Sequence, residues 1–200
     1  MANNTEEVYL GKPVTGAVQT APVGTTGPTD AGTELPSASW DASGFVDENG
    51  VTLSQTRNTN DLKAWGGSTV RTMLNEFDGT VQYSEMQTDE VVMKRMVGAD
   101  KVTITAATSG HGKQMKVSLG SDLPDPIAWV FSMKDGDKRV RIYIPKGQLT
   151  EVGDTNFVHN GAIKWDFTIK ALDDGTGNSI YIFTDDGKVL SDSDTDTDTE

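Results

Sequence analysis

Two histidines, His111 and His159, are the first side chains to consider for acid–base chemistry or metal binding. Each lies in a stretch rich in glycine or asparagine, and neither has a serine–acid arrangement or a group of carboxylates near it in the sequence. A general base must be oriented by such partners, so surface loop positions are the favoured interpretation. The chain has no cysteine, which excludes disulfides, thiolate metal sites and a cysteine nucleophile. We therefore predict that the protein is not an enzyme and that it uses no cofactor and no metal.

Two further patterns resemble ligand-binding motifs only in part. Gly112-Lys113 resembles the end of a phosphate-binding loop, but Gln114 stands where that motif needs Ser or Thr, and Ala107 stands where it needs Gly. The last residues include alternating acids, Asp192, Asp194, Asp196 and Asp198. A calcium-binding loop would also need a central glycine and a glutamate at its twelfth position, and both are missing. A solvated acidic tail is the favoured interpretation of this segment.

The four tryptophans could form a platform on which sugar rings stack. Trp129 and Trp165 fall on apolar faces of predicted strands, where packing in the core is the usual role. Only Trp40 and Trp65 then remain free for a ligand or an interface. A carbohydrate-binding β-sandwich module is therefore the alternative function, and it would need exposed aromatic side chains on one face.

The segment from Trp65 to Gly98 predicts the central unit of the fold. Residues 70–74 and 81–86 alternate as strands, and Asp78-Gly79 between them favours a tight hairpin turn, or a bulge within one long strand. The hairpin would pair Leu74 with Tyr83, and both of its faces would be mixed in polarity. Strands with no apolar face to bury are either exposed to solvent on both sides or covered by another copy of the chain.

A short helix is predicted next. Thr88 can cap its N-terminus, the two acids that follow suit the positive end of the helix dipole, and Lys94-Arg95 suit the other end. Gly98 can end the helix in the left-handed conformation. One side would be apolar through Val92, Met93, Met96 and Val97.

The remaining alternation predicts a mainly antiparallel β domain, a sandwich or barrel with one short α-helix. The expected strands cover residues 102–106, 115–119, 127–133, 140–144, 163–171 and 180–183, with a short one at 148–152. Pro145-Lys146-Gly147 would end the strand before it. A turn at Asp135-Gly136 would pair Phe131 with Val140, and the polar residues 55–61 read as a loop.

The two ends of the chain differ from the middle in composition. Residues 1–36 have thinly spread apolar residues, four of the seven prolines and five glycines, so they are a flexible leader or an arm that docks on a neighbouring subunit. We expect an extended N-terminal arm over 1–40, a β domain over 41–184 and an acidic tail over 185–200. No apolar run is long enough to span a bilayer, so no membrane insertion is expected.

The charge argues against tight binding of nucleic acid. The formal net charge is −13. Residues 185–200 contain seven acids and one lysine, so they carry −6 and the rest of the chain carries −7. A DNA-binding surface needs a basic patch, and none is apparent in the sequence.

Several segments resemble the tail tube (major tail) proteins of long, non-contractile-tailed bacteriophages, in particular those that infect actinobacteria. They are MANNTEEVYLGKPVTGAVQTAPVGTTGPTD, ENGVTLSQTRNTNDLKAWGGSTVRTMLNEFDGTVQYSEM and KRVRIYIPKGQLTEVGD. The Ala64-Trp65-Gly66-Gly67 step and the Arg-x-Ile-x-Ile-Pro strand are the more specific parts of this resemblance. It covers roughly residues 1–183.

The resemblance implies a structural virion protein. Subunits of that family form hexameric rings that stack into a tube, and strands of every subunit join an inner β-barrel through which DNA passes without specific binding. It further implies a tape-measure protein in the lumen, tail terminator and tail-tip proteins as partners, and a location in the virion tail after assembly in the host cytoplasm.

Two sets of residues follow as expectations for such a tube. The acids expected to face the lumen are Glu76, Asp78, Glu85 and Asp89. The residues expected at subunit interfaces are Val8, Tyr9, Leu10, Val14, Val18, Leu53, Leu62, Trp65, Val70, Thr72, Leu74, Val81 and Tyr83.

Overall fold

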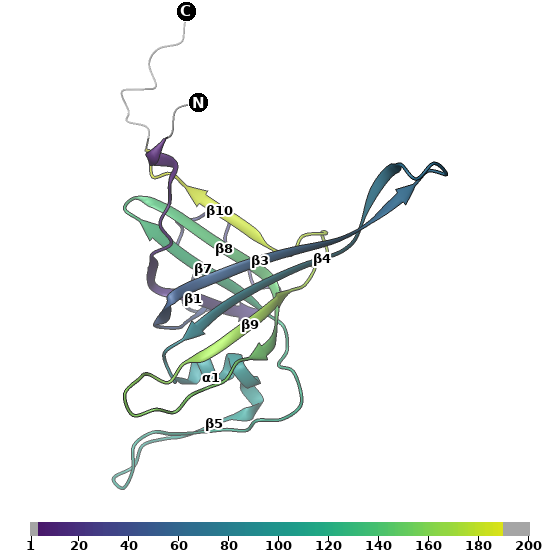
Figure 1. The fold of residues 1–200 in the computed structure, drawn as a ribbon. Coiled ribbons are helices and arrows are strands. Elements are labelled where there is room, and N and C mark those ends of the chain that lie inside the picture. The colour runs from purple at the N-terminus through teal and green to yellow at the C-terminus, as the bar shows by residue number, and fades with distance from the viewer. Residues whose placement is uncertain (1–3, 190–200) are drawn as a thin grey trace, which may run out of the picture.

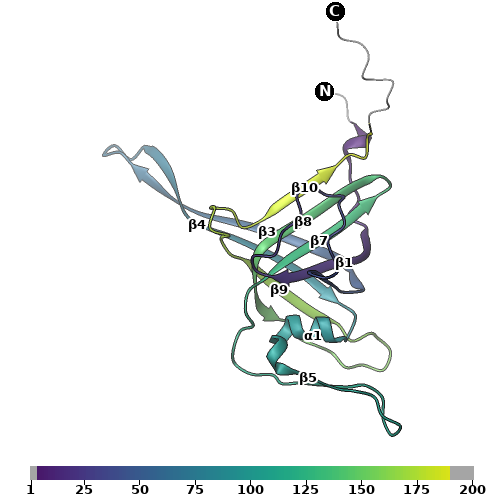
Figure 2. The same cartoon turned by 180° about the vertical axis from the view of Figure 1, so that it is seen from behind.

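The fold was analysed in a computed structural model that describes residues 4–189. In chain order its elements are η1 (Thr5–Glu7), β1 (Pro13–Pro22), β2 (Asp41–Ala42), β3 (Val46–Lys63), β4 (Thr69–Glu85), α1 (Glu90–Val97), η2 (Ala99–Lys101), β5 (Val102–Thr105), β6 (Gln114–Val117), β7 (Ile127–Asp135), β8 (Lys138–Val152), β9 (Trp165–Ala171) and β10 (Tyr181–Asp185). Figure 1 and Figure 2 show their arrangement from two sides.

Strand β8 links the two layers of the fold. Its first half lies between β7 and β10, whereas its last residues, from Gly147 onward, pair with β9. The strand order is β2-β1-β7-β8-β9-β4-β3, with β10 added to β8 beside this path, and all pairings are antiparallel. The sheets do not close into a barrel, so the mainly β prediction is confirmed in its sandwich form.

Alternation along β7, β4 and β9 places the core between the layers. Trp129 and Phe131 of β7 are buried with Tyr83 of β4 and Phe167 of β9. The Tyr83 ring lies edge-on to Phe131 at 5.2 Å and to Phe167 at 5.6 Å between centroids. Each such side chain stabilises the fold by about 1.5–3 kcal/mol through burial. The core position predicted for Trp129 is confirmed.

A smaller apolar cluster covers the opposite face of β7. Ala128 and Val130 pack there against Ala21 of β1 and Trp40, which is buried. The expectation that Trp40 is free for a ligand or an interface is therefore wrong. The segment after β1 brings this side chain back over the sheet, 6.3 Å from the Tyr143 ring.

Helix α1 forms at the predicted place with a different cap. The Asp89 carboxylate accepts the backbone N–H of Val92 at 2.9 Å, whereas the Thr88 hydroxyl accepts the indole N–H of Trp165. Gly98 ends the helix with φ 93°, a value that favours glycine. The predicted apolar side is buried, and it also includes Arg95. Strands β5 and β6 form a separate two-stranded sheet beside the helix.

The hairpin expected at Asp78-Gly79 does not exist. Strand β4 runs without a turn from Thr69 to Glu85, and its partner is β3, so residues 55–61 form a strand rather than a loop. Of the two alternatives, one long strand is correct, but its register with β3 shifts near Asn75, near Val70 and between Tyr83 and Glu85, and not at Asp78-Gly79. Tyr83 pairs with Val51 and Phe167, not with Leu74.

The hairpin of β7 and β8 is confirmed with a shifted register. Phe131 pairs with Ile142 instead of Val140, because the turn is centred on Gly136-Asp137, one residue later than expected. Gly136 has φ 64°, which explains why the turn forms around it. The shift moves each partner by two residues and leaves the same side chains on the core face. Strand β8 also continues through Pro145 and includes the predicted short strand at 148–152.

The expected extended arm over 1–40 needs correction. Residues 13–22 form β1, which pairs with β7 and places Val18 in the core, so the part of the described chain outside the sheet before β1 is short. At the other end Asp185 belongs to β10, and the expected acidic tail lies mainly at 190–200, outside the described residues. Residues 4–189 contain no helix long and apolar enough to cross a membrane.

Candidate assembly site

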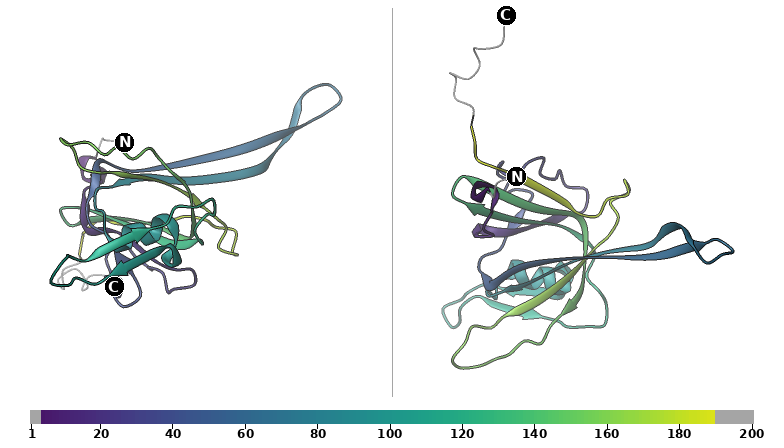
Figure 3. Two further views of the ribbon diagram at one scale, coloured as in Figure 1. Left: turned by 90° about the horizontal axis from the view of Figure 1, so that it is seen from below. Right: turned by 45° about the horizontal axis from the view of Figure 1, so that its top comes forward.

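The most conspicuous feature of the molecule is a hairpin that leaves the body. Strands β3 and β4 are packed in the sandwich near Val51 and Tyr83, and their other ends extend well beyond it (Figure 1, Figure 3). We call residues 54–77 the projecting hairpin. Nearly all of them are exposed on both faces, because no other element of the described chain covers them.

Polar contacts across the strands hold the projecting hairpin in register. The Thr72 hydroxyl donates to the Asp61 carboxylate at 2.7 Å, and the Asn58 amide donates to Glu76 at 3.2 Å. The Arg57 guanidinium lies 5.1 Å from the centre of the Phe77 ring. Cross-strand pairs of this kind contribute about 0.2–1 kcal/mol each, enough to specify the register but not to bury apolar surface.

Large apolar side chains are nevertheless exposed along the projecting hairpin. They are Leu62, Trp65, Val70, Met73, Leu74 and Phe77. The register places Leu74 and Phe77 on one face and Leu62 and Met73 on the other, with Trp65 fully exposed in the turn. The strand pair expected to have two mixed faces, residues 70–74 with 81–86, does not form, and it is the pair of β3 with β4 that exposes polar and apolar side chains on both faces. Apolar side chains gathered on an exposed surface indicate an interaction site.

The residues expected at interfaces fall into three groups. Val8, Leu10, Leu62, Trp65, Val70, Thr72 and Leu74 are exposed. Tyr9, Val14 and Leu53 are half-buried. Val18, Val81 and Tyr83 lie inside the core of the same chain, so their inclusion is wrong: β1 and the inner half of β4 already bury them.

The four acids expected to face a lumen also have different surroundings. Glu76 is exposed on the projecting hairpin, and Asp78 forms an ion pair with Lys170 at 3.2 Å while keeping about a third of its side chain exposed. Asp89 caps α1. Glu85 has no exposed surface, so it cannot face a lumen in this fold, and its assignment is corrected.

Glu85 instead belongs to a buried polar cluster that ties α1 to the sheets. Its carboxylate accepts from Arg95 at 2.9 Å, from the Ser43 hydroxyl at 2.6 Å and from the Tyr83 hydroxyl at 3.2 Å. Arg95 also donates to the Thr20 hydroxyl at 2.9 Å. Burial raises the pKa of Glu85, because loss of water disfavours the charged form, although Ser43 and Arg95 oppose this effect. Burial likewise raises the pKa of Tyr83.

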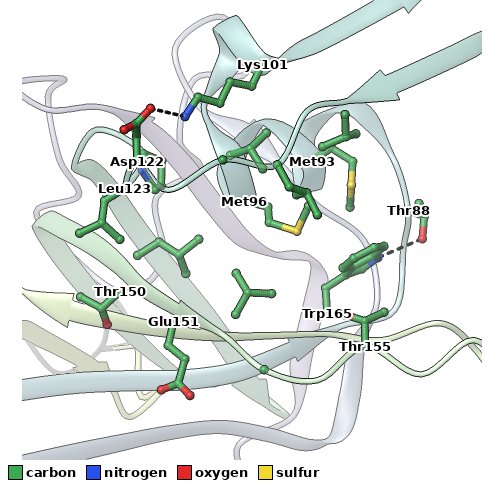
Figure 4. A pocket seen from close by; sticks show the side chains of 18 of the residues that line it. Thr88, Met93, Met96, Lys101, Asp122, Leu123, Thr150, Glu151, Thr155 and Trp165 are labelled. Carbon is green, nitrogen blue, oxygen red and sulfur yellow. Dashed lines mark hydrogen bonds and ion pairs between the residues drawn. The ribbon is translucent and has the colours of Figure 1, made fainter.

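A cavity of about 740 Å³ opens beside α1 (Figure 4). Met93 and Met96 of the helix line one side, and the Trp165 ring and Leu149 line others. The ion pair of Lys101 with Asp122 at 3.2 Å also lines the cavity, whereas the Glu151 carboxylate points away from the two methionines (Figure 4). Four exposed apolar residues also line it, Leu119, Leu123, Val152 and Phe157. We call it the methionine cavity.

The described residues offer little for catalysis. His111 and His159 are both exposed, and the ring of His111 contacts only the carbonyl of Gly112 at 2.8 Å among the hydrogen bonds of residues 4–189. No three His, Asp or Glu side chains of that range are placed to hold a metal ion. A sugar platform is also not assembled, because Trp40 and Trp129 are buried and Trp65 lies far out on the projecting hairpin.

Sequence reasoning missed both the buried cluster and the strand character of residues 55–61. A signal for the first existed, since Arg95 follows Val92 by three positions and therefore shares its helix face. The strand at 55–61 gave no comparable signal, because this stretch has no apolar residue to mark a period.

A family model described as phage tail tube protein matches residues 1–191. No curated protein matches the chain.

Proposed function

This chain belongs to the phage tail tube protein family and is a structural component of the virion tail, and we propose that it assembles as hexameric rings stacked into a tube that delivers the genome to the host. The tails would be of the long, non-contractile kind. The observation that carries the proposal is the projecting hairpin, whose exposed apolar side chains have no cover within the described chain.

Open strand edges support growth by addition of further copies. Strand β3 is the last strand of its layer, and β10 pairs only with β8, so each leaves one edge unpaired in the described chain. Unpaired edges are templates for strands of another molecule. In the proposed ring, such edges meet between neighbouring subunits and build a continuous inner β-barrel.

The acidic charge supports a conduit through which DNA slides. A ring of six chains, each with −13, would carry −78. B-DNA carries about one negative charge per 1.7 Å, so a basic wall would hold it by counterion release, whereas an acidic wall would not. Of the expected lumen acids, Glu76 of β4 is exposed and suited to that position, and Asp78 and Asp89 retain partial exposure.

A tube with two ends and a hollow interior would need further proteins as binding partners. A tape-measure protein would occupy the lumen during assembly in the host cytoplasm, and terminator and tip proteins would close the ends. The exposed residues Val8 and Leu10 before β1 would contact a neighbouring subunit.

Electron microscopy of two shortened chains tests the proposal. Replacing residues 59–75 by Asn-Gly would close β3 and β4 by a two-residue turn between Asn58 and Glu76, which pair in the sheet. The matched control replaces residues 106–113 by Asn-Gly between the paired Thr105 and Gln114. We expect hollow filaments of six-fold symmetry from the wild type and the control, and soluble folded monomers from the shortened β3–β4 chain.

Two results would contradict the proposal. One is a wild-type protein that remains monomeric at every concentration and salt condition that keeps it folded. The other is normal tubes from the chain without residues 59–75, which would show that the projecting hairpin has no part in assembly.

A further inference from the structure

Two apolar surfaces of this chain have no partner within the described residues, and they lie at different ends of the molecule. One is the turn of the projecting hairpin with Trp65, and the other is the methionine cavity with its exposed rim of Leu119, Leu123 and Phe157. The projecting hairpin points away from α1 in every view, so Trp65 cannot enter the cavity of its own chain (Figures 1 and 3).

We propose that Trp65 of one subunit inserts into the methionine cavity of a second copy. This inference rests on the proposed function, because it names the contact that joins one subunit to the next. A protrusion that fits a recess elsewhere on the same molecule makes a head-to-tail contact, and such contacts either close into a ring or propagate into an open polymer. The pair therefore joins one subunit to the next in the assembly.

The cavity has the chemistry to receive an indole ring. Its volume of about 740 Å³ and its apolar lining match those of pockets that bury large ligands. Met93, Met96 and Met115 line it, and methionine side chains adapt their shape and make favourable contacts between sulfur and aromatic rings.

Charge also matches between the two surfaces. The projecting hairpin carries three cations, Arg57, Lys63 and Arg71, against Asp61 and Glu76, for a net charge of +1 in a chain of −13. The charged residues lining the cavity are Asp122, Glu151 and Lys101, with a net charge of −1. Opposite potentials align such surfaces during encounter and disfavour other pairings.

Engineered cysteines test the contact directly, because the chain has no cysteine of its own. Tubes of the double variant Trp65→Cys, Leu123→Cys should form covalent multimers on mild oxidation, seen as a ladder in a non-reducing gel. The matched control is Glu34→Cys, Leu123→Cys, because Glu34 is exposed and belongs to neither of the two surfaces. Tubes that cross-link through Glu34 and not through Trp65 would overturn the proposal, and so would tubes that cross-link in neither variant.

Assembly thresholds provide the second measurement, for the case in which a cysteine variant does not assemble. Trp65→Ala should raise the minimum protein concentration for tube formation by about tenfold or more, as removal of a central aromatic anchor does. Trp65→Phe should restore most of the loss. If Trp65→Ala forms tubes at the same minimum concentration as the wild type, this inference is wrong but the proposed tube function stands. If the wild type never forms tubes, both the inference and the proposed function are wrong.

Discussion

Arg95 is the residue on which the position of α1 depends most. Its guanidinium is buried with Glu85, and it also donates to the Thr20 hydroxyl and to the backbone carbonyls of Val18 and Asp41. A single side chain thus connects the helix, β4 and the first two strands. Buried ion pairs contribute little net stability over an apolar replacement, but loss of one partner leaves the other charge uncompensated.

Arg95→Met should therefore destabilise the protein by about 3–5 kcal/mol at neutral pH. The loss should depend on pH, because without Arg95 burial raises the pKa of Glu85 further. A carboxyl with a raised folded pKa contributes stability that is complete below its unfolded value and is lost as the pH rises above it. The deficit in urea unfolding should thus be smallest below pH 4.5, the ordinary pKa of Glu, and grow above it. The control Arg95→Met, Glu85→Leu should show a smaller deficit without this pH dependence.

Asp89 has two possible roles, as the cap of α1 and as a negative charge at the lumen. The cap needs a hydrogen-bond acceptor, whereas the lumen role needs a charge, so substitutions can separate them. Asp89→Ala should lower the free energy of unfolding by about 1 kcal/mol, since the backbone N–H of Val92 loses its cap. Asp89→Asn keeps a capping oxygen and should cost much less. Denaturant unfolding of both variants measures the difference, and equal losses would show that the cap is not what the side chain provides.

At the scale of elements, β8 holds the two layers together, and Gly147 is the point where it passes from one to the other. Gly147 pairs with Ile127 of β7 and with Ala171 of β9. Its carbonyl accepts the indole N–H of Trp129 at 3.2 Å. A Cβ atom at this position would lie 2.5 Å from the Trp129 ring and 2.9 Å from Ile169, so only glycine fits without movement of the core.

Gly147→Ala should consequently destabilise the fold by about 1–3 kcal/mol, the usual cost of overpacking. Thermal unfolding measures it, with Gly112→Ala as the control, because a Cβ atom there would have no atom within 4 Å. A loss at Gly147 no larger than that at Gly112 would mean that the crossing of β8 tolerates a side chain.

The projecting hairpin should be the first part of the free subunit that a protease cuts. Arg57, Lys63 and Arg71 are exposed there, and the strands around them are not covered by the body. Trypsin should cleave unassembled protein within residues 57–71 and leave the sandwich folded, whereas assembled tubes should be protected. Mass spectrometry of the fragments locates the cuts. Equal cleavage before and after assembly would contradict burial of this element between subunits.

The elements that the sequence predicted well are those with one solvent-exposed face and one buried face. Strand β9 and the core face of β7 follow directly from alternation, and the place of α1 follows from its apolar side and Gly98. The outer half of β3 could not be predicted in this way, because its side chains face solvent in the single chain. The strand pair expected to be completed by another copy was wrongly assigned, because Asp78-Gly79 is typical of a hairpin turn but is also compatible with a continuous strand.

At the scale of the whole molecule, the charge of the chain must be compatible both with assembly of the tube and with movement of DNA through it. The buried and capping acids, Glu85 and Asp89, have structural roles, so the test of the lumen is best confined to Glu76 and Asp78. Salt screens charges beyond about 8–10 Å, and only acids close to the passing DNA will therefore slow or ease its movement.

Phage that carry Glu76→Gln with Asp78→Asn should assemble tails of normal length and release DNA more slowly than the wild type, because the wall loses repulsion. Replacement by neutral amides keeps the polar contact of Glu76 with Asn58, although Asp78 loses its ion pair with Lys170. The matched control, Glu34→Gln with Asp100→Asn, removes the same charge from exposed positions elsewhere. Time-resolved fluorescence of a DNA dye outside the capsid measures release. Release that is equally fast in both variants would show that these two acids do not act on the DNA, and a slowing that disappears at high salt would identify the effect as electrostatic.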